Sequence, residues 1–346
     1  MYPLLLKPPV KDYLWGGTRL KTEYNYETDR EKAAEAWVLS CHKDGEDVVI
    51  NGELAGKTLS YALKQWGDKA IGKNAARFPY FPLLIKLIDA KDRLSVQVHP
   101  DDTYALKNEG EYGKTEMWYV VDCEEGAELI YGFNREVSKE EFERRIRDNT
   151  LPEICNSVPV HKGDVFFIAA GTLHAIGAGI LIAEVQQNSN TTYRVSDYGR
   201  LGADGKPRQL HIEKALDVTK REKPQIPYGG IGKTEKTPYG TVRELAKCDL
   251  FTASLTELDG KTEIHCEESF TSLVVLDGKI TVKWEGGELE AIKGGSVFVP
   301  AGCTAELSGK AVAYRCDVAD FAAVKDLMAQ IKKEFGTVDI LGNKAG

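Results

Sequence analysis

The sequence lacks the long apolar runs and paired cysteines that mark several large classes of protein. No stretch of its 346 residues reaches the roughly 18 uninterrupted apolar residues that a membrane-spanning helix needs. Residues 1–7 lack the charged start and apolar run of a signal peptide. The seven cysteines form no Cys-x-x-Cys pair, which argues against a disulfide framework and a thiolate zinc finger. We therefore expect a cytoplasmic protein with free thiols and no membrane partner.

Positively charged residues are fewer than negatively charged ones. The chain has 45 Lys and Arg against 53 Asp and Glu, which gives a formal net charge of −8. This balance argues against nucleic acid as a partner, so any anionic substrate must be bound by a local cluster of Lys and Arg. Hydrophobic residues make up 42% of the chain, enough for a sizeable core. The length fits two domains.

Most of the sequence is typical of short β-strands separated by turns. Apolar or alternating runs recur at residues 82–88, 93–99, 116–121, 164–168 and 180–186. Many short strands with frequent turns predict a sandwich or barrel. Helical patterns are confined to 57–67, where Thr58 can cap, and to 138–148, where Ser138 opens a capping box with Glu141.

A weak internal repeat is present. Residues 163–174 match residues 294–305 without gaps, and both copies are typical of a strand, a glycine turn and a second strand. The copies differ at their last position, which is His174 in the first and Ala305 in the second. We infer two related β-barrel modules, of which the first can bind a metal. Residues 201–245 are predicted to connect them.

Four metal-capable residues fall at strand or turn positions of the first module. Gln97 and His99 are two apart in a strand-like run, so both side chains leave the same face. Glu116 opens the next apolar run, and His174 follows the Gly171 turn. Two imidazoles, a carboxylate and an amide oxygen suit a borderline cation such as Zn²⁺ at a catalytic site. The alternative is that each histidine is a hydrogen-bonded structural residue.

Residues 1 to about 312 resemble the type I mannose-6-phosphate isomerases of the short bacterial kind, which are double-cupin enzymes. The matching segments follow the family's order: 14–17, 35–40, 81–86, 94–102, 113–119, 171–175 and 187–194. The resemblance implies a mainly β fold of two jelly-roll barrels, with small helical insertions and a C-terminal helix. It implies one Zn²⁺ per chain, bound by Gln97, His99, Glu116 and His174.

The resemblance also implies an activity, the interconversion of mannose 6-phosphate and fructose 6-phosphate in carbohydrate metabolism. Arg194 is our candidate for stabilising the oxyanion of the enediolate, because guanidinium stays protonated and reaches two oxygens. Glu184 is our candidate base, since burial among apolar residues would raise its pKa; the alternative is a structural ion pair with a Lys or Arg. Lys114 is predicted to help open the sugar ring or to bind a hydroxyl.

The substrate phosphate needs cations or hydroxyls near the same pocket. Lys86, Ser95 and Arg200 are our candidates, because the matching family positions line the phosphate end of the pocket. Each of the three could otherwise be an ordinary surface residue. Trp15 and Trp118 are expected to pack in the core.

The end of the chain changes character. We expect a catalytic cupin domain over 1–245 and a metal-free cupin domain over 246–312, followed by a tail at 313–346. The tail resembles a fragment of a short-chain dehydrogenase/reductase, with an amphipathic helix over 320–335. No Gly-rich fingerprint and no Tyr-x-x-x-Lys pair accompany it, so we predict no dinucleotide partner and no function for the tail. We expect it to replace the last strand of the second cupin.

Two other functions fit parts of the pattern. A cupin that binds a sugar phosphate around a metal without turnover needs no base, and the presence of Arg194 and Glu184 therefore favours an enzyme. A cupin oxygenase would use Fe²⁺ instead of Zn²⁺. The Gln97 ligand and the predicted phosphate site make that function a poorer match.

Overall fold

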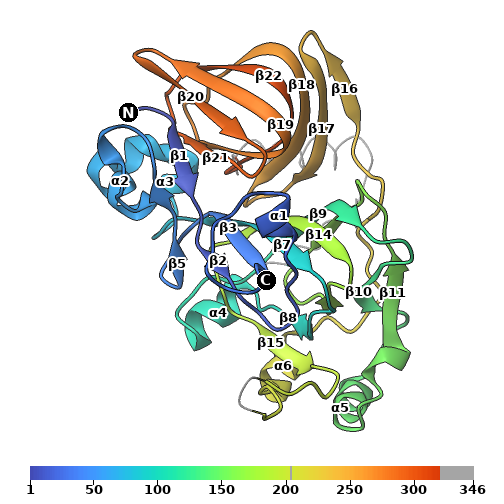
Figure 1. Ribbon diagram of the computed structural model, residues 1–346. Coiled ribbons are helices and arrows are strands. Elements are labelled where there is room, and N and C mark those ends of the chain that lie inside the picture. Colours follow the sequence, from blue (N-terminus) through green and yellow to red (C-terminus); the bar gives the residue numbers. More distant parts are fainter. Residues whose placement is uncertain (203–204, 320–346) are drawn as a thin grey trace, which may run out of the picture.

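The computed structural model describes residues 1–202 and 205–319 (Figure 1). Within them the protein is mainly β, and its sheets are antiparallel. The helix predicted at 320–335 lies outside the described residues. No helix of the described chain is both long and apolar enough to cross a membrane.

The largest sheet has nine strands and contains both early and late residues. Its order is β16 (Thr234–Thr237), β17 (Gly240–Lys247), β18 (Thr252–Ile264), β22 (Ala305–Asp317), β19 (Thr271–Trp284), β21 (Ser296–Val299), β1 (Leu4–Lys7) and β6 (Val48–Val49), with β20 (Gly287–Ile292) beside β19. The pairing of Leu4 with Phe298 joins β1 to the C-terminal strands of this sheet, as Figure 1 shows for dark-blue β1 and orange β21, and β6 pairs with the other side of β1.

Two further sheets build the part of the chain that carries the predicted site. The six-stranded sheet has the order β12 (Val165–Ile168), β9 (Glu116–Cys123), β14 (Ile180–Gln187), β7 (Leu83–Ala90), β3 (Glu35–Leu39) and β2 (Val10–Lys11). The five-stranded sheet has the order β11 (Cys155–Pro159), β10 (Glu128–Phe133), β13 (His174–Ala175), β8 (Val96–Val98) and β15 (Tyr193–Ser196). A small hairpin pairs β4 (Cys41–His42) with β5 (Gly45–Glu46).

The six-stranded sheet lies in the middle and is buried on both faces. Its inner face, with Trp118 and Ile182, packs against Tyr131 of the five-stranded sheet. Its outer face, with Ile85 among others, packs against Tyr314 of the nine-stranded sheet. This double burial explains why β7 and β14 are buried along their whole length and show no regular alternation of polar and apolar residues. Polar residues on the inner face are therefore exceptions that need partners.

The predicted repeat is confirmed by backbone geometry. β12 is followed by a turn and then β13, and β21 is followed by a turn and then β22. Gly163 and Gly294 have φ angles of 92° and 87°, and Gly171 and Gly302 have φ angles of 86° and 72°. These values are accessible mainly to glycine, so both copies of the repeat need glycine at both positions.

Both predicted helical islands are present, with the predicted caps. They are α2 (Leu59–Trp66), where Thr58 accepts a hydrogen bond from the Tyr61 N–H, and α5 (Lys139–Arg147), capped by Ser138. The remaining helices are α1 (Arg19–Thr22), α3 (Gly72–Ala76), α4 (Asp102–Asn108) and α6 (Ile212–Val218), with 3-10 turns η1 (Gly52–Leu54), η2 (Gly67–Ala70) and η3 (Leu151–Ile154).

The prediction that helices occur only at 57–67 and 138–148 is wrong for the described residues. No helix was predicted directly after His99, but Asp101 accepts a hydrogen bond from the Tyr104 N–H and caps α4. The segment 201–245, predicted to be a connection, contains α6, β16 and most of β17. Because β17 pairs with β18 along most of its length, this segment is partly built into the nine-stranded sheet.

Candidate metal centre

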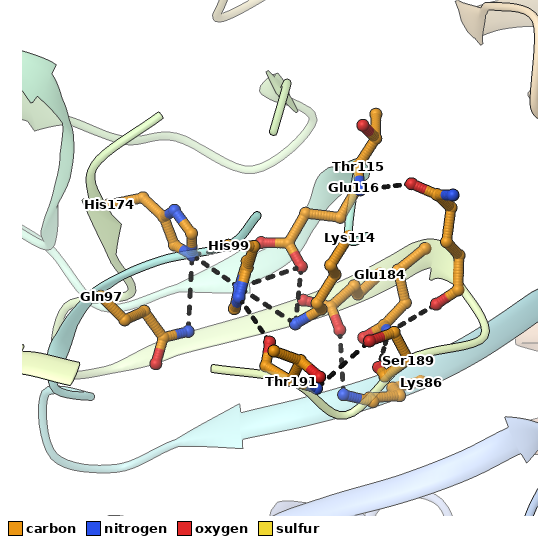
Figure 2. Close-up of polar contacts among 12 residues, drawn as sticks. Lys86, Gln97, His99, Lys114, Thr115, Glu116, His174, Glu184, Ser189 and Thr191 are labelled. Atoms are coloured by element: carbon orange, nitrogen blue, oxygen red, sulfur yellow. Dashed lines mark hydrogen bonds and ion pairs between the residues drawn. The ribbon is translucent and has the colours of Figure 1, made fainter. Parts of the chain in front are cut away.

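Three of the predicted metal ligands converge at one end of the space between the six- and five-stranded sheets. His99 follows β8, Glu116 is the first residue of β9, and His174 is the first residue of β13 (Figure 2). One ligand atom from each lies within 4.8 Å of the others, and all three side chains are buried. The cross-strand pair His174–Gln97 fixes how β13 and β8 meet, which aligns the two histidines.

The nitrogen and oxygen atoms of the three ligands face a common point. The Nε2 atoms of His99 and His174 are 3.1 Å apart. The Glu116 carboxylate lies 3.4 Å from His174 Nε2 and 3.8 Å from His99 Nε2. This spacing of two imidazoles and a carboxylate is a suitable ligand set for a divalent cation.

Backbone carbonyls hold the opposite edge of each imidazole. His99 Nδ1 is 2.9 Å from the Thr191 carbonyl, and His174 Nδ1 is 2.8 Å from the Thr172 carbonyl. A carbonyl can only accept, so each Nδ1 must carry the proton and donate it. The lone pair on each Nε2 is then directed at the shared point, which is the tautomer that a metal ligand needs.

Burial sets the charges of this cluster. It lowers the pKa of His174 to about 4 and the pKa of His99 well below its usual value, with Lys114 adding to both shifts. Burial also raises the pKa of Glu116 to about 7, although Lys114 opposes this shift. The Lys114 ammonium is 2.8 Å from Glu116 and 3.2 Å from His99 Nε2. The predicted candidate Lys114 therefore lies directly at the cluster.

Gln97 lies beside the three ligands with its amide nitrogen toward them. Its Nε2 atom is 3.4 Å from His174 Nε2, and its Oε1 atom is 3.4 Å from the Ser95 hydroxyl. Rotating the amide by half a turn exchanges its nitrogen and oxygen. The predicted role of Gln97 as an oxygen ligand requires that second orientation.

Arg194 and Ser95 lie next to Gln97. Arg194 is opposite Gln97 in the β15–β8 pair, and its Nε–H donates to the Ser95 hydroxyl at 3.3 Å. Burial and the nearby Arg208 lower the pKa of Arg194, but a guanidinium remains protonated at neutral pH. The predicted oxyanion and phosphate candidates Arg194 and Ser95 are thus brought together on one side of the cluster.

Glu184 and Lys86 form a buried pair on the inner face of the six-stranded sheet. They are opposite each other in β14 and β7, and Lys86 Nζ is 3.3 Å from Glu184. Burial alone would raise the pKa of Glu184, but Lys86 and Lys114 outweigh it and the pKa falls below its usual value. The raised pKa expected for Glu184 is therefore wrong, because the sequence could not reveal the opposite lysine.

Arg200 lies on the loop after β15 and is paired with two acidic residues. Its guanidinium is 2.6 Å from Asp197 and 3.5 Å from Asp92, and it also donates to the Arg93 carbonyl. Arg208 binds the same Asp197 carboxylate. Of the three phosphate candidates, Ser95 adjoins Arg194, Lys86 lies with Glu184, and Arg200 belongs to this separate ion-pair network.

Trp118 contributes to the site, although the sequence indicated only core packing. Its indole N–H donates to Glu184 at 2.8 Å, and its ring meets the His174 ring edge-on at 5.3 Å. Its position two residues after Glu116 in one strand was a usable signal, since residues two apart share a face. The carbonyls of Thr172 and Thr191 carry no such signal, because any residue supplies a carbonyl.

A family description, "Phosphomannose isomerase type I, catalytic domain", matches residues 4–129, and "Mannose-6-phosphate isomerase, cupin domain" matches residues 241–315. The description "short chain dehydrogenase" matches residues 299–346, in agreement with the resemblance of the tail.

Individual relatives cover most of the chain. Mannose-6-phosphate isomerase ManA of Bacillus subtilis is 39% identical over 278 residues, which are 80% of this chain and 86% of that protein. Mannose-6-phosphate isomerase of Streptococcus mutans is 45% identical over 222 residues, which are 64% of this chain and 69% of that protein. The crystal structure of a mannose 6-phosphate isomerase from Bacillus subtilis has a TM-score of 0.83 and 34% identity, covering 91% of this chain and 99% of that one. The chain therefore belongs to the type I phosphomannose isomerase family.

Proposed function

We propose that this protein is a zinc-dependent isomerase that interconverts mannose 6-phosphate and fructose 6-phosphate. The observation that carries the proposal is the buried cluster of His99, Glu116 and His174 in a chain of this family. Similar proteins that cover most of the chain are named for this activity. The substrate partner would be a small sugar phosphate.

The ligand atoms support a divalent cation. Glu116 is fully buried, and the Lys114 ammonium lies 2.8 Å from one of its oxygens. A buried ionised carboxylate needs positive charge, and two neutral imidazoles directed at the same point act as ligands rather than as charge partners. His99, His174, Glu116 and the Gln97 amide oxygen would hold one Zn²⁺. When bound, the ion would polarise the sugar oxygens at C1 and C2.

Three side chains of the protein would move the proton and stabilise the charge. Isomerisation transfers a proton between C1 and C2 through an enediolate, so a base must face these carbons and cations must face the oxygens. Glu184 would serve as the base, because its lowered pKa keeps it in the accepting form at neutral pH. Arg194 would stabilise the developing oxyanion, and Lys114 would bind a hydroxyl or assist ring opening.

Lys86, Ser95 and Arg200 stay our candidates for the substrate phosphate. The contact of Ser95 with Arg194 supports a phosphate position on that side of the cluster. Lys86 and Arg200 are already paired with carboxylates at 3.3 Å and 2.6 Å. Binding phosphate would therefore require either residue to exchange an existing ion pair.

The division of the chain is part of the proposal. The repeated strand–turn–strand unit supports two cupin modules, a catalytic one over 1–245 and a metal-free one over 246–312. β17 runs across the limit at 245 and is shared by the two modules, and β22 runs across the limit at 312 into the tail. We propose that residues 313–346 add no dinucleotide site and that the protein acts in the cytoplasm.

Metal removal tests the proposed function directly. The protein is treated with a chelator, and turnover of mannose 6-phosphate is measured before and after Zn²⁺ is restored. We expect activity to disappear and return, and full activity without metal would contradict the proposal. A binding protein without turnover would retain sugar-phosphate affinity and show no product with Zn²⁺ present.

Arg194→Ala is a second test of the mechanism. Loss of a group that acts on the developing oxyanion should lower kcat by at least tenfold and change KM little. Arg30→Ala, at an exposed position, serves as the control. A raised KM with unchanged kcat would assign Arg194 to substrate binding instead.

A further inference from the structure

The two histidines of the cluster donate hydrogen bonds to backbone carbonyls, one from a residue nearby in the sequence and one from a distant residue. The carbonyl that accepts from His174 belongs to Thr172, two residues earlier in the same turn. The carbonyl that accepts from His99 belongs to Thr191, which is 92 residues away in the sequence. The orientation of His99 therefore depends on the position of a loop that belongs to another part of the chain.

Several hydrogen bonds hold that loop, residues 188–191, and two buried side chains, Gln186 and Ser189, make those nearest Thr191. Gln186 Nε2 donates to the Ser189 carbonyl at 2.6 Å and to the Gln187 carbonyl at 2.8 Å. The Ser189 hydroxyl accepts from the Thr191 N–H at 3.2 Å. Both Gln186 and Ser189 are fully buried. Figure 2 shows Thr191 beside the imidazole of His99, and Ser189 joined to Thr191 by a dashed line.

The orientation of the Gln186 amide follows from its neighbours. Reversing it would place Oε1 against two carbonyl oxygens, so only the nitrogen can occupy that position. Oε1 is left buried with no hydrogen-bond partner among the described residues, which costs stability. Gln186 is also opposite Glu116 in the β14–β9 pair, so the loop is fastened next to the carboxylate of the cluster.

We propose that Gln186 and Ser189 are positioning residues that set the tautomer and ring orientation of His99. The connection runs from the Gln186 amide to the Ser189 backbone, from the Ser189 hydroxyl to Thr191, and from the Thr191 carbonyl to His99 Nδ1. It keeps His99 Nε2 unprotonated and directed at the cluster, as a metal ligand requires. This inference rests on the proposed metal site.

The test compares metal binding in three variants of the full chain. Gln186→Met keeps the length of the side chain and removes the donor, and Ser189→Ala removes only the hydroxyl. Ser272→Ala is the matched control, because Ser272 is equally buried and its hydroxyl has no hydrogen-bond partner among the described residues. Zn²⁺ affinity is measured by competition with a chelator. The absorption spectrum of bound Co²⁺ reports ligand geometry.

We expect Gln186→Met and Ser189→Ala each to weaken Zn²⁺ binding by about 10- to 100-fold and to change the Co²⁺ spectrum. Because they act through one connection, the double variant should lose much less than the product of the two effects. Ser272→Ala should bind both metals like the parent. If Gln186→Met does not fold, Ser189→Ala decides the question alone.

Unchanged Zn²⁺ affinity and Co²⁺ spectra in the two variants, with only a lower thermal midpoint, would overturn the positioning role and leave the proposed function intact. A parent protein that binds no Zn²⁺ would overturn both. Loss of affinity in Ser272→Ala to the same extent would also overturn the positioning role, because any buried hydroxyl would then have the same effect.

Discussion

At the scale of single residues, the ionisation of Glu116 decides how metal binding depends on pH. Burial raises its pKa to about 7, and the pKa of His174 is lowered to about 4. Below about pH 7 a cation must displace a proton from Glu116, so Zn²⁺ affinity should fall about tenfold per pH unit there. The neutral histidines contribute little to this change above about pH 5. Titration calorimetry in buffers of different ionisation enthalpy should find about one proton released at pH 6 and almost none at pH 8.

Glu116→Gln provides the control for this proton count. It removes the titrating carboxyl, so any residual Zn²⁺ binding should release no proton at pH 6. Equal proton release at pH 6 and pH 8 in the parent would rule out Glu116 as the group responsible.

The buried pair of Lys86 and Glu184 gives a second prediction at this scale. Lys86→Met should destabilise the protein by about 3–5 kcal/mol, because it takes away the nearest cation of a buried carboxylate. Urea unfolding measures this loss. Lys7→Met, at the exposed pair with Glu27, should cost at most about 1 kcal/mol.

The double variant Lys86→Met, Glu184→Met completes the comparison. Replacing both charges leaves no unpaired ion, so most of the stability lost in Lys86→Met should return. If the double variant is as unstable as the single one, lost packing and not unpaired charge explains the effect.

Some features of the site residues were predictable from the sequence, and others were not. The spacing of Gln97 and His99 and the repeat ending at His174 placed the cluster's histidines, because strand alternation and turn position are local properties. The pairing of Glu184 with Lys86 and of His99 with the Thr191 carbonyl was not predictable, since each depends on cross-strand or loop contacts between distant segments.

At the scale of elements, the two copies of the strand–turn–strand unit should respond differently to the same change. Gly302→Ala should cost about 1–2 kcal/mol, because a side chain at this positive φ meets only the flexible Glu267. Gly171→Ala should cost more, since its new Cβ would lie 2.8 Å from the Val218 carbonyl oxygen. It should also weaken Zn²⁺ binding by displacing His174. Unfolding curves and chelator competition on both variants measure these effects, and equal results would contradict the prediction.

The strands and capped helices were predictable because their signals are local. The runs that became β7, β9, β12 and β14, and the caps Thr58 and Ser138, required only neighbouring residues. The short helices α4 and α6 were missed because seven residues present too little apolar periodicity. The partner of β1 was not predictable, since nothing in residues 4–7 identifies β21 as its neighbour.

At the scale of the whole molecule, β22 lies where two family matches overlap. The cupin-domain match reaches residue 315 and the short-chain dehydrogenase match begins at residue 299, so both include most of β22, which is hydrogen-bonded to β18 and β19 on its two sides. The hydrogen bonds between these strands join backbone groups, so any strand that buries suitable side chains can form them. In β22 the buried side chains include Tyr314 and Cys316.

Truncations test this view of the C-terminal segment. A chain that ends at residue 319 should keep its fold, Zn²⁺ binding and isomerase activity, because it retains all of β22. A chain that ends at residue 304 should fail to fold, since it loses the strand between β18 and β19. Circular dichroism and the isomerase assay compare the two, and loss of activity in the longer chain would assign a role to residues 320–346.

The pairing of β1 with β21 has a consequence for synthesis of the chain. Residues 296–298, the partners of Leu4 and its neighbours on one side, emerge from the ribosome about 290 residues after them. At translation rates of about 5–20 residues per second, this delay is roughly 15 to 60 s. During that time the nascent polypeptide has an unpaired edge, which makes it a natural client for chaperones that shield such edges until termination.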